Sequence, residues 1–385
     1  MKSWLLVAGD FTPLGGMDAA NHALARYLAV SHPDTHVHLV THRAAPDLQT
    51  LPRVTVHGVR RPFGRHALGS ALLARAGVRV WRQLRPQGVQ PIVNGGNCPI
   101  PGAVNWIHYL HAAYRPATAV SALQRAKGTL VHYRDLAAER AALADASLIL
   151  CNSRRTRDDV VQYIGVDASR TRVVYYGGDP VRFSHVTPDD RAAVRARFGW
   201  PVDRPLVAFV GALGDRRKAF DTVFAAWVRL CANPQWDANL VVAGSGAEQP
   251  AWTRKASEHG FGDRIRFVGF RDDVPELLCA VDALVHPARY EAYGLSVREA
   301  LCRGIPAIAS RSAGVAEEYP ASLDDLLLTD PDDAAELEGR LLVWRRHRKV
   351  FDAAVEKVGQ RLRVRTWDHM AAEIVTAVDE MALVR

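Results

Sequence analysis

The sequence predicts an α/β protein with two doubly wound parallel sheets, one in each half of the chain. Its 385 residues are enough for two ordinary domains. Short apolar runs recur in both halves, and several are followed by a loop and then by a helical pattern, as in residues 4–28 and 206–227. Strands that alternate with helices form parallel sheets, and the binding sites of such sheets lie at the carboxyl ends of the strands.

The composition is that of a globular protein whose charge is unevenly distributed. Hydrophobic residues make up 48% of the chain, and the net charge is +8. Residues 1–200 hold 25 Lys and Arg against 13 Asp and Glu, a net +12, and the other 185 hold 24 against 28, a net −4. A basic first half attracts anionic lipid, an acidic substrate or nucleic acid. No nucleic-acid-binding motif accompanies the charge, so we expect no nucleic-acid partner.

Cysteine spacing and hydropathy indicate the compartment. The five cysteines (Cys98, Cys151, Cys231, Cys279 and Cys302) are scattered without metal-ligand spacing, which fits reduced thiols and argues against a zinc site. No apolar run is long enough to span a membrane, and the apolar core of the first residues is too short for a secretory signal. We therefore expect a cytoplasmic protein with no metal site.

The first strand, residues 4–8, leads into a glycine-containing loop at residues 9–16. Gly15 and Gly16 stand where the next helix begins, and the loop lacks the G-x-G-x-x-G fingerprint of nicotinamide-binding domains. A plain strand-to-helix turn explains the pair as well as a ligand site does. Residues 37–40 and 54–56 are the next predicted strands.

Residues 60–85 carry seven arginines and no acidic residue. Arg75, Arg79 and Arg82 share one face of the predicted helix, and apolar residues share another. A basic amphipathic helix can bind the surface of a membrane. The alternative is a solvated helix that packs its apolar face into its own domain.

A strand at residues 101–107 runs into a loop with two histidines, His108 and His111. Strand ends are where parallel sheets place their sites, so either histidine is a candidate. A further strand within residues 143–153, a helix at 156–164 and a last segment at 172–179 complete the first half. The proline-containing residues 181–205 form the linker.

The second half opens with a buried strand at residues 206–211. The cations Arg216, Arg217 and Lys218 follow it, directly before a predicted helix. Cations oppose the dipole of a helix N-terminus, so their placement there suits the arrival of a polyanion such as a diphosphate. The alternative is a solvated basic turn. Residues 240–246 and 265–270 are the next strands.

Residues 283–310 form the clearest strand, loop, helix, strand unit of the chain. Gly294 stands where the helix begins, and the first amides of a helix bind anions because they have no acceptor within it. Glu291 precedes the helix and Glu299 lies about one and a half turns inside it. Carboxylates accept hydrogen bonds from sugar hydroxyls. A phosphate held between two such carboxylates describes a nucleotide sugar, whereas an ordinary surface helix with two solvated Glu residues is the alternative.

The run EAYGLSVREALCRGIPAIAS resembles the donor-site signature of the retaining glycosyltransferases of GT-B fold, family 4 (glycosyl transferases group 1). Glu291, Tyr293, Gly294, Leu295 and Glu299 occupy the places of that signature, and Ser296 follows at the helix start. The resemblance extends over nearly the whole chain in motif order. Two places differ. Ala212 replaces the family's Arg after the strand, and Tyr176-Gly177-Gly178-Asp179 replaces its Asn-Gly-Val-Asp.

The resemblance implies two Rossmann-like domains that face each other across a cleft. Residues 1–180 would form the acceptor-side domain, residues 181–365 the donor-binding domain, and a last helix at 366–385 would cross back to the first. The function implied is metal-independent transfer of a hexose-type sugar from a nucleoside-diphosphate sugar to a glycan, lipid-linked or small-molecule acceptor, with an α-linkage. The donor is a substrate, so no cofactor is expected.

The resemblance also implies a role for each site residue. Lys218, with Arg216 or Arg217 in place of the missing Arg, and the amides after Gly294 would bind the diphosphate. Glu299 would hold the ribose and Glu291 the transferred sugar. Gly15 and Gly16 would approach the diphosphate, and His111 or His108 would lie beside the reacting carbon.

Two other readings of the sequence differ in function. A nucleotide-sugar epimerase or hydrolase of the same fold would need additional carboxylates in the first domain, where few candidates occur. A non-catalytic membrane- or glycan-binding protein would have a dead donor site, against which the intact Glu291, Glu299 and Lys218 argue. The basic first half suggests an acceptor that is anionic or held at the inner face of the membrane.

Overall fold

The computed structural model describes residues 2–62, 66–115 and 122–383. The chain divides into two compact units. Unit 1 contains most of residues 1–177 together with residues 365–385, and unit 2 contains residues 178–364. The chain therefore passes between the units at 177/178 and at 364/365, where the sequence predicted 180/181 and 365/366.

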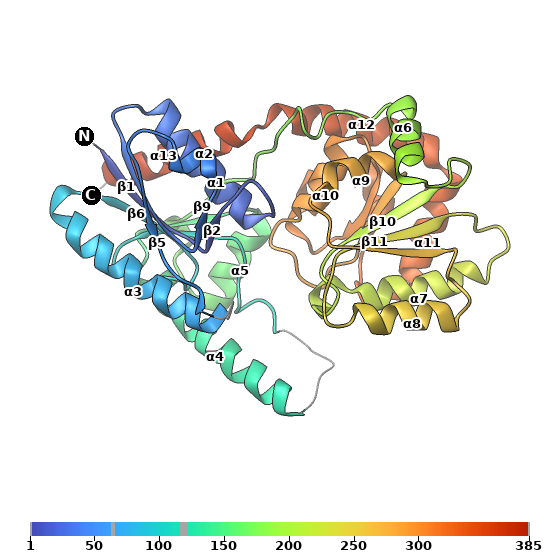
Figure 1. The fold of residues 1–385 in the computed structure, drawn as a ribbon, viewed down its shortest axis with the longest axis horizontal. Helices are drawn as coiled ribbons and strands as arrows, with labels where there is room; N and C mark the ends of the chain where they lie inside the picture. Colours follow the sequence, from blue (N-terminus) through green and yellow to red (C-terminus); the bar gives the residue numbers. More distant parts are fainter. Residues whose placement is uncertain (1, 63–65, 116–121, 384–385) are drawn as a thin grey trace. The chain divides into compact units, whose positions relative to one another are not determined.

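Unit 1 is built on a parallel sheet of seven strands in the order β5-β3-β1-β6-β7-β8-β9 (Figure 1). The strands are β1 (Ser3–Val7), β3 (His36–Thr41), β5 (Val54–Gly58), β6 (Gln90–Asn94), β7 (Val104–Ile107), β8 (Leu148–Cys151) and β9 (Thr171–Val173). The strand order reverses between β1 and β6, so the loops that follow these two strands flank the switch point of the sheet. A separate two-stranded ladder pairs β2 (Asp10–Phe11) with β4 (Arg43–Ala44).

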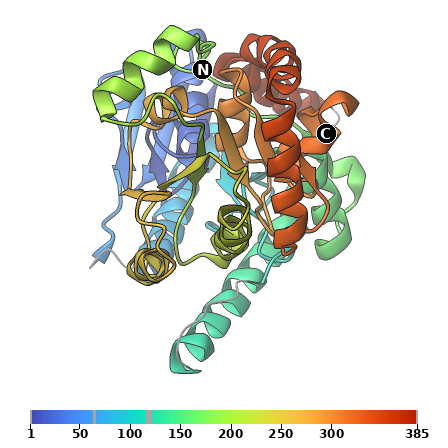
Figure 2. The ribbon, with the colours of Figure 1, turned by 90° about the vertical axis from the view of Figure 1, so that its right-hand side faces the viewer.

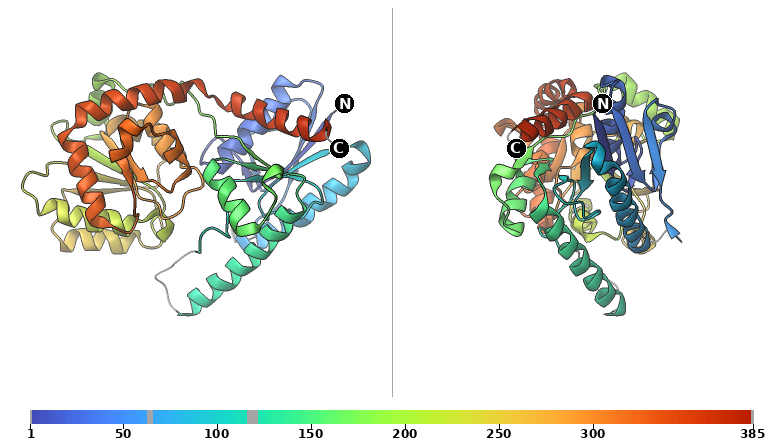
Figure 3. Two further views of the ribbon diagram at one scale, coloured as in Figure 1. Left: turned by 180° about the vertical axis from the view of Figure 1, so that it is seen from behind. Right: turned by 90° about the vertical axis from the view of Figure 1, so that its left-hand side faces the viewer.

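The helices of unit 1 cover both faces of this sheet. They are α1 (Met17–Ser31), α2 (Pro46–Gln49), α3 (His66–Leu84), α4 (Ala122–Asp145), α5 (Arg154–Ile164) and α13 (Trp367–Leu383). The last helix packs against α1, although some 340 residues separate them in the chain. Figures 1 and 3 both show the first half of α4 extending beyond the sheet of its own unit.

Unit 2 is a second doubly wound sheet, with the strand order β12-β11-β10-β13-β14-β15. Its strands are β10 (Leu206–Val210), β11 (Asn239–Ala243), β12 (Ile265–Gly269), β13 (Ala283–His286), β14 (Ala307–Ser310) and β15 (Leu327–Leu328). Its helices are α6 (Pro188–Phe198), α7 (Phe220–Cys231), α8 (Gln249–Glu258), α9 (Val274–Ala280), α10 (Leu295–Cys302), α11 (Ala334–Arg346) and α12 (Arg348–Val364). Figures 1 and 2 show the strands enclosed between two helical layers. The switch point lies between β10 and β13.

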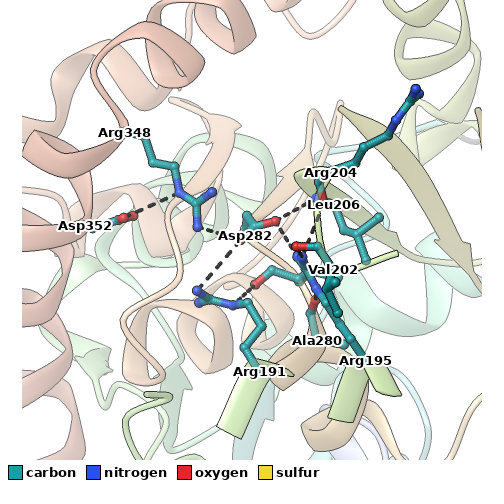
Figure 4. A network of polar contacts seen from close by, with 10 residues as sticks. Arg191, Arg195, Val202, Arg204, Leu206, Ala280, Asp282, Arg348 and Asp352 are labelled. Atoms are coloured by element: carbon teal, nitrogen blue, oxygen red, sulfur yellow. Dashed lines mark hydrogen bonds and ion pairs between the residues drawn. The ribbon is translucent and has the colours of Figure 1, made fainter. Parts of the chain in front are cut away.

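A buried ionic cluster fastens the amino ends of the central strands β10 and β13, which are the ends opposite the switch-point loops. Figure 4 shows its side chains around Asp282. The carboxylate of Asp282 is 2% exposed and receives Arg195 and Arg348, each at 2.5 Å, and the backbone N–H of Leu206 at 2.7 Å. Arg191 lies 3.7 Å away. Arg195 also donates to the carbonyl of Ala280 at 2.7 Å. The ion pairs and hydrogen bonds of Asp282 tie α6, α12 and both strands together.

The helix α3 has the amphipathic character that the sequence predicts. Leu73 and Val80 are buried in the core of unit 1, whereas Arg75, Arg79 and Arg82 are exposed. Within the described ranges, no helix is both long and apolar enough to cross a bilayer.

Candidate functional site

The switch point of unit 2 brings together two side chains that lie 73 residues apart in the chain. Lys218 comes from the loop after β10, and Glu291 comes from the loop after β13. The ammonium group of Lys218 lies 2.5 Å from Glu291 Oε2, and the two side chains are 17% and 14% exposed. Arg217 Nη1 approaches the same oxygen at 3.5 Å. Two predicted cations therefore converge on the first predicted carboxylate.

The protonation states of this cluster follow from its partners. Burial alone would raise the pKa of Glu291, but Lys218, His286 and Arg217 outweigh it and hold that pKa well below its usual value. His286 Nε2 lies 3.2 Å from the same carboxylate oxygen. Burial, with Lys218 nearby, lowers the pKa of His286, so its ring is neutral and donates to Glu291. The cluster is thus one carboxylate, two cations and a neutral imidazole.

Arg289 fastens the two loops to each other, a role that the sequence analysis did not predict. Its backbone N–H donates to the carbonyl of Arg217 at 2.8 Å, and its guanidinium forms two 2.9 Å bonds with the carboxylate of Asp221. The guanidinium also reaches Asp332 at 2.6 Å and the carbonyl of Arg216. A planar guanidinium with paired carboxylates holds a fixed geometry, so Arg289 positions the basic loop beside Glu291.

The basic residues form a turn of their own, which corrects the expected placement at the start of a helix. Arg216–Lys218 make a 3-10 turn that Asp215 caps, and α7 begins only at Phe220 after Ala219 at φ 54°. The conflict with the helix dipole is therefore smaller than predicted. Arg217 is drawn inward by Asp215 and Glu291, whereas Arg216 is exposed.

The second predicted anion-binding feature, the start of α10, also lies close to Glu291 in the chain. Gly294 takes φ 113°, and the helix runs from Leu295 to Cys302 without a side-chain cap at its N-terminus. A Cβ at Gly294 would lie 2.9 Å from Val315 Cγ1, so the loop needs glycine here. The amides of Leu295 and Ser296 have no acceptor inside the helix, and the positive end of the dipole adds to their attraction for anions.

Of the other predicted donor-binding residues, Tyr293 anchors the loop before α10, and Glu299 differs from Glu291 in its charge state. The side chain of Tyr293 is 2% exposed, and its carbonyl accepts the N–H of Val315 at 2.7 Å, so it anchors the loop. Glu299 lies on α10, where burial raises its pKa to about 7 despite Arg182, Arg298 and Arg303. The two carboxylates therefore have opposite tendencies: Glu291 stays ionised, and Glu299 titrates near neutral pH.

In unit 1, Gly15 and Gly16 lie after β2 and lead into α1. Gly15 has φ 84°, and Gly16 is the residue that precedes α1. The first turn of α1 carries Asp18, whose pKa is raised to about 6 by burial and by the nearby Asp10. This loop flanks the switch point of unit 1.

The two candidate histidines have different surroundings. His108 stacks on Tyr176 with ring centroids 5.8 Å apart, and its Nδ1 bonds to the hydroxyl of that tyrosine. Burial lowers the pKa of His108 to about 3, so this ring is neutral. Tyr176, which stands in the place of the family's Asn, thus holds the ring of His108 in position. Asn152 donates a hydrogen bond to the hydroxyl of Tyr176 at 3.2 Å.

The side chain of His111 is 34% exposed and is held from behind by Glu139, a residue that the sequence analysis did not identify. Glu139 Oε1 lies 3.0 Å from His111 Nδ1 and 2.9 Å from the backbone nitrogen of His111, and Oε2 accepts the N–H of Ala112 at 3.1 Å. Glu139 is fully buried on α4. In the part of the chain that the structure describes, no group of three His, Cys, Asp or Glu side chains could hold a metal ion.

Comparisons with known proteins agree with this arrangement of two sheets. Residues 14–182 match the family model described as Glycosyltransferase Family 4, and residues 190–351 match that of glycosyl transferases group 1. The chain is 26% identical to a D-inositol 3-phosphate glycosyltransferase of Stackebrandtia nassauensis over 71% of its length. It is 30% identical to a 2-deoxystreptamine N-acetyl-D-glucosaminyltransferase of Streptomyces fradiae over 63%. The matched segments span 63% and 57% of these relatives, less than two thirds of each.

Solved structures show the same fold over the full chain. The Anabaena protein Alr3699/HepE, crystallised with UDP and glucose, superposes with a TM-score of 0.72 at 19% identity, covering 98% of this chain and 99% of its own. Two family models that together cover both units and the shared fold identify the chain: it belongs to the GT-B glycosyltransferases of family 4.

Proposed function

We propose that this protein is a retaining hexosyltransferase that moves a sugar from a nucleoside-diphosphate sugar to an acceptor hydroxyl and forms an α-glycosidic bond. The observation that carries the proposal is the convergence of Lys218 and Arg217 on Glu291, next to the uncapped start of α10. A nucleotide sugar has groups that fit all three: its diphosphate binds cations and open amides, and its sugar hydroxyls donate hydrogen bonds to a carboxylate. A structural neighbour binds UDP and glucose, which supports such a donor.

In this proposal the leaving diphosphate is stabilised by the protein's own cations. As the anomeric C–O bond breaks, its electron pair passes to the diphosphate, and charge develops on the phosphate oxygens. Four groups would stabilise that charge: Lys218, one of Arg216 and Arg217, and the amides of Leu295 and Ser296. They take the role that a metal ion has in other transferases, and the reaction uses no cofactor beyond its donor substrate.

The two carboxylates of the signature take different hydroxyl groups of the donor. Glu291 is ionised and accepts hydrogen bonds from the transferred sugar, and Glu299, on α10, accepts them from the ribose. Of the two histidines, the geometry favours His111 beside the reacting carbon. Its ring is partly exposed, whereas His108 is engaged with Tyr176 and buried.

The acceptor is proposed to be anionic or held at an anionic membrane surface. The names of two relatives contain D-inositol 3-phosphate and 2-deoxystreptamine, so acceptors within this family range from anionic to amine-bearing. The charge of +12 on residues 1–200 favours the anionic class. Arg75, Arg79 and Arg82 line a shallow hollow on α3 and offer an exposed basic face for a lipid surface at the inner side of the membrane.

Thermal unfolding with UDP, GDP, ADP and dTDP tests the donor site first. At about 100 times its dissociation constant, the correct nucleotide should stabilise the protein by about 2.7 kcal/mol. The Lys218→Met variant should lose most of that shift, and its kcat should fall roughly 100-fold or more because one stabilising charge is removed. Lys255→Met, an exposed lysine on α8, is the matched control and should behave as the native protein does. If none of the four nucleotides raised the unfolding temperature, a dead donor site would explain the molecule better.

The stereochemistry and the membrane surface need separate experiments. The anomeric coupling in the NMR spectrum of the product distinguishes an α-linkage from a β-linkage, and a β-product would overturn the retaining proposal.

Sedimentation with anionic vesicles tests whether the basic face of α3 binds a lipid surface. Binding should fade as ionic strength rises, because exposed charges more than a Debye length apart are screened. Binding that is equal at low and high salt, or absent at low salt, would contradict an electrostatic docking face.

A further inference from the structure

Glu139 is a buried carboxylate whose contacts all lead to the loop that carries His111. It comes from α4, 28 residues after His111, and it is fully buried. Gly96, in the loop after β6, allows α4 to come close, because a Cβ there would lie 2.6 Å from the backbone nitrogen of Glu139. Carboxylates are rarely fully buried without paired donors. The position of Glu139 therefore depends on the N–H groups that it meets.

These donors are two backbone amides and one ring nitrogen. The amides of His111 and Ala112 occupy one carboxylate oxygen each, at 2.9 and 3.1 Å. The oxygen that accepts the His111 amide also faces His111 Nδ1 at 3.0 Å. A carboxylate accepts and does not donate, so Nδ1 must carry the hydrogen in this contact. In the neutral ring, Nε2 then carries the unshared electron pair.

We propose that Glu139 is a positioning residue that holds His111 as the Nδ1–H tautomer and turns its Nε2 electron pair toward the substrate. The proposal rests on the assignment of His111 to the reacting carbon. When the anomeric C–O bond breaks, positive charge develops on the sugar ring. An Nε2 electron pair with a carboxylate behind the ring lowers the energy of that charge, whereas an Nε2–H would oppose it. The same division of work, a buried carboxylate that orients an imidazole, occurs in other enzyme classes.

Other charged groups around the ring are less well placed to fix its tautomer. His132, also on α4, has its ring centroid 6.4 Å from that of His111, and burial lowers its pKa. Tyr109 meets the His111 ring edge-on at 4.9 Å. Arg115 and Asp135 act on His132 through space. Of these, none brings an acceptor atom to Nδ1 as Glu139 does.

The variant Glu139→Gln tests the proposal with little change of shape. Its amide oxygen can still accept backbone N–H groups, but its charge is gone and it binds the Nδ1–H more weakly. We expect kcat to fall about 10- to 100-fold, the range for loss of an orienting partner, with the KM of the donor changed by less than about twofold. Asp135→Asn, the same chemical change one turn earlier on α4, should leave both constants near native values. Native kcat in Glu139→Gln would overturn the proposal.

A double-mutant cycle separates positioning from support of the loop. If Glu139 acts through His111, Glu139→Gln should change kcat by less than about twofold in a His111→Ala background. A purely structural role predicts the same loss in both backgrounds, which would overturn the proposal. The ¹⁵N shifts of the His111 ring give a readout independent of activity. The native protein should show a protonated Nδ1 and a bare Nε2, and the variant should show a mixture. A native ring with its proton on Nε2 would refute the positioning role.

The same experiments distinguish failure of the underlying assignment. If His111→Ala transfers sugar at the native rate, His111 does not serve the reaction, whatever its tautomer. If His111→Ala is slow but the native ring carries its proton on Nε2, His111 acts and Glu139 does not position it as proposed.

Discussion

The affinity for the donor should depend on pH because Glu299 titrates near neutrality. Burial raises the pKa of this carboxyl to about 7. In its proposed role Glu299 accepts hydrogen bonds from the ribose hydroxyls, and protonation turns one of its acceptor oxygens into a donor. At pH 6 about one molecule in eleven would be ionised, and at pH 8 about ten in eleven. The dissociation constant of a nucleotide sugar should therefore fall roughly tenfold from pH 6 to pH 8, about 1.4 kcal/mol.

Two other titratable groups of unit 2, Glu291 and His286, do not obscure this effect. Glu291 has a pKa held well below its usual value, so it is ionised throughout this range. Burial, with Lys218 nearby, lowers the pKa of His286, which disfavours its protonated form in this range. The diphosphate of a nucleotide sugar is esterified at both ends and gains no proton between pH 6 and 8. The stability of the protein without ligand should change with pH in the opposite direction to the donor affinity. The folded protein holds the Glu299 proton more tightly than the unfolded chain does. Its ionisation between pH 4.5 and about 7 therefore lowers the free energy of unfolding.

Titration calorimetry at pH 6, 7 and 8 and constant ionic strength measures the effect, with the nucleotide sugar whose base stabilises the protein. Glu299→Gln imitates the protonated form, so it should bind weakly and equally at all three values. A native affinity that does not change with pH would refute the reasoning. The same holds if the variant kept the full dependence, because the titrating group would then lie elsewhere.

Two further variants test the framework around the site. Asp282→Asn should destabilise unit 2 by about 3–5 kcal/mol in denaturant unfolding, because Arg195 and Arg348 lose a buried partner. Asp352→Asn, 43% exposed and 3.6 Å from Arg348, should change stability by less than about 0.5 kcal/mol, and equal losses would contradict the role of the buried cluster. Gly294→Ala should cost about 1–2 kcal/mol for its positive φ and weaken nucleotide binding roughly tenfold or more, and undiminished binding would show that the start of α10 does not meet the diphosphate.

The parts of the fold that the sequence predicted are those in which local pattern and topology agree. Alternating apolar runs and helical segments located most of the parallel strands of both units, although β6 and β15 were not predicted. The loops after β10 and β13 then had to be neighbours at a switch point. Glu291, Gly294 and Lys218 lie on those two loops, so their meeting followed from strand order. Their roles in binding and transfer remain predictions.

Residues that act across long sequence distances left no comparable signal. Arg289 binds Asp221 from 68 positions away, and nothing in the local pattern of either residue indicates the pairing. Glu139 reaches His111 only because Gly96 lets α4 approach the strand ends. Asp282 gathers arginines from two helices. Each depends on tertiary packing, which neither periodicity nor spacing encodes.

The spacing of residues in the sequence does not predict the charge states of the two carboxylates of this site. Glu291 and Glu299 are the same residue type eight positions apart, yet cations lower the pKa of one and burial raises that of the other. The ionised state of Glu291 matters before the donor binds. Lys218 and Arg217 would repel each other in an empty site, and the carboxylate of Glu291 keeps them together. An incoming diphosphate offers these cations a second anion. We therefore expect Glu291 to exchange part of its ionic contacts for sugar hydroxyls when the donor binds, so that one carboxylate both assembles the empty site and orients the sugar.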